Sequence, residues 1–520
     1  ARSDQFAFCV ALFEALYGRR PFIGRTAAEI RVAVFRPLEL PVEPRRVPGH
    51  LRRLLLRGLQ RMPDDRYPGM PALLAALAAD PARRWRRLGL GGAALTLGFA
   101  SALGSGYLAA EQRCDHGAER VRKVWDDDRA AAARAAFLAT GVAYAAETWP
   151  KVQAELDAHA AAWSQHRDEF CAATHLRGEA SSELLDLRNR CLDTNLGELD
   201  ALVSTLVIAD ATTVERGLQL VSSLTPPGRC ADDRFVRERV APPGEPALAD
   251  AVARARTHLA RAAARREAGR PRDARELASA VRRSSDELDY LPLRAEALLE
   301  LGRSEEATAD YDLARGHLAS AYHLALGIAH DTAATDAAIA LSLVHYRVSR
   351  FPEAFAWSEH ARSLLQRTGE PPDQRVWYLL YRSYIQTRLS LFPDAVAAAS
   401  EGLALAEASF PAADPRTARM VAGLAHARWA GGSPDQALVL FQRSQDILRA
   451  GVGREHPSLA SAGINISSIH LHRHEWSEAL AALRPNIELM ERAYGPDSPN
   501  VADCLINLSS TLGQIGRAHV

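Results

Sequence analysis

The chain has 520 residues, 48% of them hydrophobic, so it is long enough for several domains with buried cores. Its 63 basic and 63 acidic residues balance, and no basic tail or acidic run stands out. This composition argues against nucleic acid or another polyanion as a partner. Apolar residues recur at helical spacing along most of the chain, which predicts an all-α protein.

Both ends of the sequence lie inside structured patterns. The chain begins at Ala1 rather than at a methionine, and we interpret both ends as truncations. The last six residues, 515–520, also read like translated sequencing-adapter DNA, so we expect them to be an artefact rather than part of the fold.

Two segments within residues 1–80 share a helical pattern followed by a proline turn. Between Ser3 and Phe22, apolar residues lie at helical spacing, and a Gly-Arg-Arg-Pro turn ends the helix. The second segment, Leu54 to Pro68, is a leucine-rich helix followed by the sequence MPDDRYP. Together these segments resemble the end of the C-lobe of a protein kinase, so we expect residues 1–80 to be a remnant of that lobe.

The resemblance implies structural roles for two residues. Asp4 would brace the backbone of the catalytic loop, and Arg66 would pair with a glutamate after the activation segment. The Gly-rich loop, the strand lysine and the catalytic-loop motif of a kinase should precede residue 1. We therefore expect no catalytic residue and no cofactor in this chain; ATP and Mg²⁺ would serve only an intact parent kinase.

Three short motifs imitate chemical sites without the residues that such sites need. The sequence HRD at 166–168 matches a kinase catalytic loop, but Ala173 occupies the position of the metal-binding asparagine. We interpret Asp126–Asp128 as a solvated helix face and the histidines of His470–His474 as turn residues. No Cys/His zinc spacing occurs, so we predict no metal site.

Residues 88–110 contain no charged side chain and follow a basic flank, residues 81–87. A helix of this length is roughly 35 Å long, enough to cross a hydrocarbon core of about 30 Å. We predict a transmembrane helix at 88–110; the alternative is a buried helix of a soluble protein. The arginine-rich flank places residues 1–87 in the cytoplasm and residues 111–520 in the periplasm of a bacterial inner membrane.

Small residues recur at every fourth position of this predicted span: Ala94, Gly98, Ala102 and Gly106. Such a stripe lets two helices approach closely, so we expect a homodimer in the membrane. The alternative is the alanine and glycine richness of a high-G+C genome.

Residues 111–246 are expected to form an extracytoplasmic helical domain, with helices at Arg120–Leu138, Pro150–Cys171 and Ser181–Leu206. Pro-Pro-Gly sequences at 226–228 and 242–244 mark its boundary. The domain looks like the segment between the membrane and the repeats in bacterial transmembrane Ser/Thr kinases.

Four cysteines fall within this domain: Cys114, Cys171, Cys191 and Cys230. In an oxidising compartment they would form two disulfides, for which three pairings are possible. We favour Cys171–Cys191, across a turn near Gly178, which leaves Cys114 for Cys230. The alternative is four buried free thiols.

Residues 247–514 repeat themselves. Ala395, Ala437 and Ala479 are 42 positions apart, and Asn465 and Asn507 have the same spacing. Earlier turns are expected at Gly269–Ala274, Gly302–Ala307 and Arg350–Ala354. A fixed period of helix, turn and helix indicates a solenoid, and this one resembles tetratricopeptide repeats of the kinesin light chain variety. That resemblance implies a concave peptide-binding groove in which Asn465 and Asn507 would bond a peptide backbone; the alternative is bonding between helices.

These observations favour a truncated receptor-type Ser/Thr kinase, of which this chain is the membrane-anchored sensing and protein-binding part. The alternative is a soluble scaffold whose repeats bind other proteins.

Overall fold

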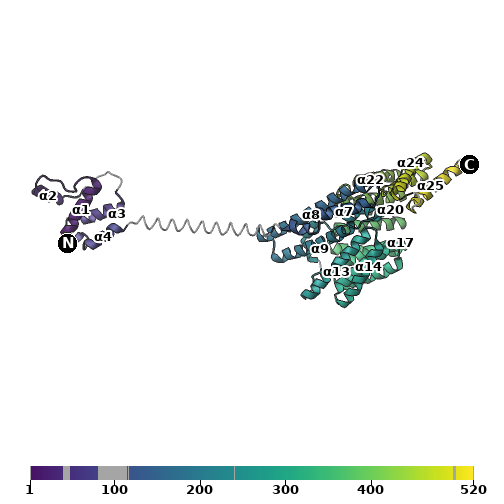
Figure 1. Ribbon diagram of the computed structural model, residues 1–520, viewed down its shortest axis with the longest axis horizontal. Helices are drawn as coiled ribbons and strands as arrows, with labels where there is room; N and C mark the ends of the chain where they lie inside the picture. The colour runs from purple at the N-terminus through teal and green to yellow at the C-terminus, as the bar shows by residue number, and fades with distance from the viewer. Residues whose placement is uncertain are drawn as a thin grey trace. The chain divides into compact units, whose positions relative to one another are not determined.

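The computed structural model of the protein describes residues 2–38, 47–79, 114, 116–238, 240–495 and 499–518. These residues form helices and no β-strand, as the sequence predicts. The chain divides into two compact units, residues 1–109 and 110–520, which are considered separately (Figure 1).

The predicted transmembrane helix, its basic flank at 81–87 and the small-residue stripe lie outside the described residues. Among the helices that the structure does describe, none is both long and apolar enough to span a bilayer.

The first unit is a small cluster of helices. It contains α1 (Arg2–Tyr17), α2 (Ala27–Val34), α3 (Gly49–Gly58), the 3₁₀ helix η1 (Pro63–Asp65) and α4 (Met70–Ala78). Its core joins α1, α3 and α4 through Cys9, Phe13, Leu54, Leu55, Leu59 and Leu73. The helix predicted near the N-terminus is therefore α1, and the residues at helical spacing form its buried face.

The second unit begins with the helical domain, residues 114–238. Its helices are α6 (Gly117–Arg122), α7 (Asp127–Ala139), α8 (Ala145–His175), α9 (Ser182–Leu206), α10 (Ala211–Glu215), α11 (Gly217–Ser222), the 3₁₀ helix η2 (Pro227–Ala231) and α12 (Asp233–Glu238).

Three tryptophans form the centre of this domain. Trp125, Trp149 and Trp163 are each at most 6% exposed. The indole Nε1 of Trp163 donates to the carbonyl oxygen of Leu192 at 2.7 Å, and that of Trp125 donates to Asp157 Oδ1 at 2.7 Å. Each of these buried indole N–H groups thus has an acceptor. The two hydrogen bonds connect α8 to α9 and to the segment that follows α6.

Several predicted boundaries in this domain are wrong. The helix predicted at 120–138 is broken, because the side chain of Asp126 accepts a hydrogen bond from the Arg129 amide and starts α7. Pro150 lies inside α8 rather than at its first position. The first Pro-Pro-Gly sequence is not a boundary, since η2 packs within the domain core through Cys230.

The four cysteines of the domain form two disulfides, Cys114–Cys171 and Cys191–Cys230. The pairing that we favoured, Cys171–Cys191, is therefore wrong. α8 ends four residues after Cys171, whereas Cys191 lies nine residues into α9. At about 1.5 Å per residue, the two cysteines are offset by roughly 7 Å along the hairpin, in addition to the separation of the helix axes, which is too far for a disulfide.

The rest of the second unit is a series of antiparallel helix pairs, apart from the last helix. The pairs are α13 (Pro246–Glu267) with α14 (Pro271–Glu287), α15 (Leu291–Ala307) with α16 (Tyr311–Gly327), α17 (Asp331–Arg347) with α18 (Phe351–Arg367), α19 (Pro372–Arg388) with α20 (Phe392–Ser409), α21 (Pro415–Ala430) with α22 (Pro434–Val452), and α23 (Leu459–His472) with α24 (Trp476–Tyr494); α25 (Pro499–Ala518) follows. Within the described residues, each helix packs against its neighbours in sequence.

The anchor alanines have the packing role that their spacing predicts. Ala395, Ala437 and Ala479 are fully buried where the second helix of a pair begins. The turn before each such helix contains a residue in the left-handed backbone region, for example Ala309 at φ 61° and Ser349 at φ 59°. A single left-handed residue reverses the chain within three positions.

The turn predicted at Gly302–Ala307 is wrong, because these residues lie inside α15. A Cβ atom on Gly302 would lie 2.6 Å from Cγ of Leu318 on α16. Glycine is therefore needed at this position for close approach of two helices, and the turn follows at Ala309.

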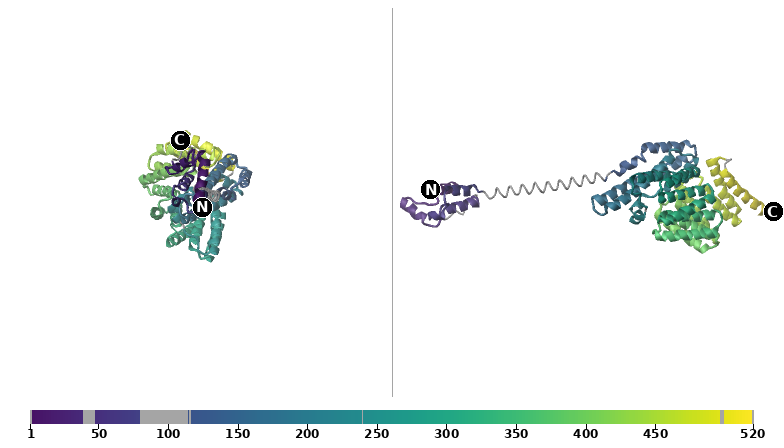
Figure 2. Two further views of the ribbon diagram at one scale, coloured as in Figure 1. Left: turned by 90° about the vertical axis from the view of Figure 1, so that its left-hand side faces the viewer. Right: turned by 90° about the horizontal axis from the view of Figure 1, so that it is seen from below.

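The helical domain lies alongside the repeats within the second unit. Figure 1 shows α8 and α9 running beside the repeat helices, and Figure 2 shows the same arrangement from below. α9 packs against α13 at one end, and α8 contacts α22 at the other. The helical domain therefore spans the repeat array instead of extending from its first helix.

Candidate functional site

A cavity of about 1230 Å³ lies between the helical domain and the repeats. The first helices of successive pairs, α13, α15, α17, α19 and α21, form one wall. Side chains of α9, of α11 and of the segment from Thr225 to Arg229 form the other. We call this space the central cavity; it is built by two parts of the chain that are far apart in sequence.

Contacts at both ends hold the helical domain across the array. Near η2, Arg229 lies 3.6 Å from the carboxylate of Asp373 on α19. Near α22, the ammonium group of Lys151 donates to the Ala450 carbonyl oxygen at 3.3 Å. The ring of His456 lies against Tyr144, with centroids 4.9 Å apart.

His456 is a buried histidine whose tautomer is fixed by its neighbours. The Ser458 amide donates to Nδ1 at 3.2 Å, so Nε2 carries the proton and donates to the Glu215 carbonyl oxygen at 2.8 Å. Burial, with a smaller contribution from the charge of Lys151, lowers the pKa of His456 to about 4. The neutral ring therefore joins the repeats to the helical domain near neutral pH.

The repeat wall of the cavity is crossed by a ladder of polar pairs between successive first helices. Arg266 on α13 contacts Glu300 on α15 at 2.9 Å, and Arg303 on α15 contacts Asp336 on α17 at 3.2 Å. Asp336 Oδ1 also accepts from Nε2 of Gln374 on α19 at 2.8 Å. These pairs use the guanidinium groups of Arg266 and Arg303 to hold one repeat against the next.

Between α19 and α21 the contact is a cation–π contact instead of an ion pair. The guanidinium Cζ of Arg419 lies 5.1 Å from the centroid of the Trp377 ring, and Trp377 stacks on Tyr381 with centroids 5.9 Å apart. Arg419 is exposed in the cavity wall and has no carboxylate within ion-pair distance among the described residues. Here an aromatic face takes the place of the carboxylate partner.

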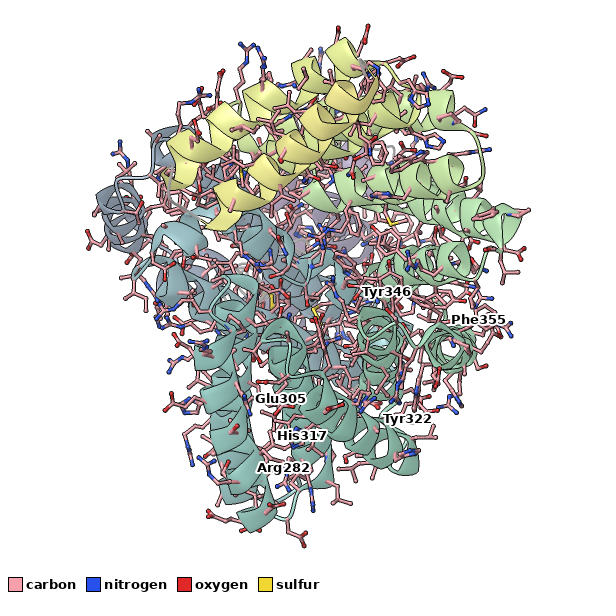
Figure 3. The ribbon with its side chains drawn as sticks, turned by 90° about the vertical axis from the view of Figure 1, so that its right-hand side faces the viewer. Arg282, Glu305, His317, Tyr322, Tyr346 and Phe355 are labelled. Atoms are coloured by element: carbon pink, nitrogen blue, oxygen red, sulfur yellow. A yellow bond between two sulfur atoms is a disulfide. The ribbon has the colours of Figure 1, made fainter. Side chains whose placement is uncertain are left out.

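Other polar contacts between helices lie outside the cavity lining. In Figure 3, Glu305 on α15 and His317 on α16 lie on neighbouring helices, and His317 Nδ1 is 2.7 Å from Glu305 Oε2. Glu305 is only 2% exposed, and it also faces Arg275 at 3.7 Å. These contacts hold α14, α15 and α16 together.

The structure does not bring the two predicted groove asparagines to one site. Asn465 lines a smaller cavity of about 200 Å³, which shares Arg419, Glu215 and His456 with the lining of the central cavity. Asn507 lies on α25 and belongs to the lining of neither cavity. The sequence analysis did not identify Trp377 and Arg419 as lining residues of the cavity. The aromatic residues Trp377 and Tyr381, four positions apart on a first helix, were a signal that could have indicated this wall.

The two residues singled out by the kinase resemblance lie in the first unit. Arg66 donates to the carbonyl oxygens of Gln60 at 2.7 Å, Arg2 at 3.1 Å and Arg61 at 3.2 Å, and its guanidinium covers the ring of Phe6. It therefore closes the turn after α3 onto α1. Asp4 lies in the first turn of α1.

The HRD sequence at 166–168 has structural contacts on α8. Asp168 Oδ1 accepts from the Gly117 amide at 2.9 Å, and Arg167 contacts Asp193 at 3.0 Å. His470 Nδ1 lies 2.6 Å from Glu475 Oε2 at the end of α23. The described residues contain no group of three or more side chains suited to a metal ion.

A tetratricopeptide repeat family profile matches residues 458–519. No curated protein matches the chain. Among solved structures, a Rap protein complexed with competence and sporulation factor is similar at 13% identity, with 64% of this chain and 88% of that one covered and a TM-score of 0.41.

Two further solved structures are similar to parts of the chain. Aspartyl phosphate phosphatase F from Bacillus subtilis has 11% identity, 66% and 86% coverage, and a TM-score of 0.39. TPR-like repeats of the kinesin light chain type from Podosopora anserina have 17% identity, 38% and 97% coverage, and a TM-score of 0.32. The profile match covers α23 to α25, and the same helix–turn–helix unit recurs from α13 onwards. Residues 458–519 are therefore similar to tetratricopeptide repeats, and the described helices from α13 to α22 form an array of the same helix–turn–helix units.

Proposed function

We propose that the second unit binds a peptide, or a segment of another protein, in the central cavity. The cavity itself carries this proposal. Its volume of about 1230 Å³ exceeds the roughly 300–1,000 Å³ of a small-molecule pocket. Its lining combines carboxylates, guanidinium groups and the half-buried rings of Trp377 and Tyr381, which suits a chain with both polar backbone and apolar side chains.

The test is to fill the cavity without disturbing the repeats. Ala340 on α17 lines the cavity and is partly exposed, so Ala340→Phe should place a ring in the ligand space. Ala397→Phe is the matched control, because Ala397 is exposed on α20 and lies outside the lining. Retention of a randomised peptide pool by the full chain should fall with the first substitution and persist with the second; equal retention by both variants refutes the site.

The finer proposal is a receptor-type kinase fragment anchored in a bacterial inner membrane, with residues 1–87 in the cytoplasm and 111–520 in the periplasm. The two disulfides of the helical domain support it, because structural disulfides persist in oxidising compartments. The kinase resemblance of residues 1–80 provides the proposed link to signalling. Self-association through Ala94, Gly98, Ala102 and Gly106 would carry a ligand signal across the membrane.

Protease added to spheroplasts tests this topology. The repeats should be digested while a fragment containing residues 1–87 remains protected, and detergent lysis should expose that fragment. Protected repeats would reverse the orientation. Recovery of the whole chain in the soluble fraction without detergent would instead support the scaffold alternative, in which the repeats organise partners without a membrane anchor.

A further inference from the structure

The smaller cavity of about 200 Å³, which we call the side pocket, adjoins the central cavity. The residues that line both spaces include Glu215, Gln219 and Ser458, and we call this shared part the mouth. Beyond the mouth, the lining lies between α11, α21, α22 and α23 and is mostly apolar, as at Leu218 and Phe441. The side pocket therefore has a polar mouth and an apolar deep end.

The side pocket is long and narrow. One stripe of α22, formed by Phe441, Ser444, Leu448 and Val452, runs along it. On α21 the lining extends from Pro415 to Ala422, a length of about 10 Å at about 1.5 Å per residue. A volume of about 200 Å³ over this length gives a mean cross-section of about 20 Å², so the space suits one extended chain better than a branched group.

The repeat period explains why this space is open. Ala462 on α23 lies 42 positions after Met420 on α21, and Ser444 on α22 lies 42 positions after Gly402 on α20. Met420 is fully buried, and its methyl group occupies the space beside Gly402. One repeat later, the equivalent residues Ala462 and Ser444 both line the side pocket. The side pocket is therefore the space that a methionine side chain fills in the preceding repeat.

The hydroxyl groups of the deep end already have partners in the fold. Ser444 Oγ donates to the Ala418 carbonyl oxygen at 2.8 Å, and Ser461 Oγ donates to the Ser458 carbonyl oxygen at 3.0 Å. What the deep end offers to a ligand is thus mainly apolar surface, and covering such surface is favourable because it is removed from water.

We infer that the side pocket binds an unbranched apolar chain at least as long as a methionine side chain. This chain can be a side chain of a peptide held in the central cavity, in which case the inference rests on the proposed function. It can also be the tail of a free small amphiphile. The shared chemistry is a flexible apolar chain in the deep end, with the polar part of the ligand at the mouth beside Glu215, Gln219 and Ser458.

The test uses the full chain in digitonin, a detergent without an unbranched alkyl chain, and two pairs of probes. The first pair consists of amidated, N-acetylated heptapeptide pools whose central residue is either methionine or valine. Their other positions are drawn from glycine, alanine and uncharged polar residues. The second pair consists of 1-hexanol and cyclohexanol, which have equal carbon numbers. Retention by immobilised protein is measured for the pools, and saturation-transfer NMR is measured for the alcohols.

We expect a preference of about tenfold for the unbranched member of at least one pair, because only an unbranched chain reaches the apolar deep end. A preference confined to the peptide pools identifies a peptide side chain as the ligand. A preference shown by the alcohols identifies the tail of a free amphiphile.

Two substitutions fill the side pocket with side chains that the protein already uses at equivalent positions. Ala462→Met copies Met420, and Ala422→Ile copies Ile464, which lies 42 positions later on α23. Each should abolish the preference for the unbranched probe. Ala397→Met is the matched control, because Ala397 is exposed on α20 and lies outside the lining. The control should bind every probe as the unsubstituted chain does.

The inference and the proposed function fail in distinguishable ways. If the unsubstituted chain distinguishes neither pair of probes, or if both filled variants keep the preference, the inference is wrong; retention of both peptide pools would leave the proposed function intact. If neither pool is retained while 1-hexanol still binds more tightly than cyclohexanol, the proposed function fails and the side pocket is upheld.

Discussion

His456 on the repeat side of the second unit donates from Nε2 to the backbone carbonyl oxygen of Glu215 in the helical domain, across 241 positions of sequence. Because the imidazole is 2% exposed and its Nδ1 already accepts a hydrogen bond from Ser458, a second proton has no place in the folded protein. The contact therefore makes the junction of the two parts sensitive to pH.

We predict that acidification destabilises the second unit through this residue. Burial lowers the pKa of His456 from 6.5 to about 4, so the unfolded chain binds the proton more readily between these two values. Stability is complete above pH 6.5 and is lost as the pH falls toward 4; the loss from this group between pH 7 and 5 is about 2 kcal/mol.

The measurement is the free energy of unfolding by urea at pH 7 and pH 5. His456→Gln keeps an N–H donor for the Glu215 carbonyl and does not titrate, so its pH dependence should be smaller than that of the unsubstituted chain. His159, also with a pKa lowered to about 4 by burial, should account for part of the remaining slope. His472→Gln, at an exposed position, is the control; an unchanged slope in His456→Gln would contradict the prediction.

The repeats could be predicted from sequence, whereas the cavity could not. The 42-residue period of Ala395, Ala437 and Ala479 reports contacts within single helix pairs, and all three alanines are buried as expected. The central cavity instead depends on contacts such as Arg229 with Asp373, which link residues that no local pattern relates. The disulfide pairing failed for a similar reason, since it depends on how far each cysteine lies from the α8–α9 turn.

Gly302 illustrates why a glycine in the sequence can indicate either a turn or a close helix contact. In sequence, a glycine shortly before an alanine reads as a turn, because glycine is common at helix ends. In the structure, Gly302 lies within α15 against Leu318, where a side chain would not fit. Only the neighbouring helix distinguishes the two cases.

That difference leads to a second prediction. Gly302→Ala should destabilise the unit by about 1–3 kcal/mol, since the added methyl group would meet Leu318 at 2.6 Å. Gly316→Ala on α16 is the control with the opposite expected sign. Gly316 is exposed, and a Cβ atom there would meet no atom within 4 Å, so the substitution should raise the free energy of unfolding by about 0.5–1 kcal/mol. Urea unfolding of both variants measures the two signs, and stabilisation by Gly302→Ala would show that the helices can separate freely.

A third prediction concerns the disulfide nearest the cavity. Cys191–Cys230 closes a loop with a sequence separation of 39, so replacing both cysteines by alanine should cost about 4 kcal/mol in the chain-entropy model. The loss should also weaken peptide retention, because Cys230 holds η2, and the adjacent Arg229 lines the cavity and contacts Asp373.

The pair Cys114–Cys171 is the control for this experiment. Its sequence separation of 57 gives a similar entropic cost, but no residue next to Cys171 lines the cavity, whereas Arg229 lies next to Cys230. Removing it should reduce stability and leave retention at saturating peptide unchanged. Equal effects of the two double substitutions on retention would show that η2 does not shape the site.

The last prediction separates a half-buried ion pair from the packing around it. Arg256 on α13 and Glu296 on α15 form a two-pronged contact at 2.9 and 2.7 Å, and Nε2 of His330, the residue just before α17, lies 3.3 Å from the same carboxylate. Glu296→Leu alone should cost about 3 kcal/mol, because it leaves the Arg256 guanidinium, only 30% exposed, without its partner. Adding Arg256→Leu should recover most of that loss, since two apolar side chains can pack where a desolvated pair stood. A double-mutant cycle by urea unfolding measures the coupling, and additive losses from the two substitutions would show that Arg256 and Glu296 do not stabilise each other.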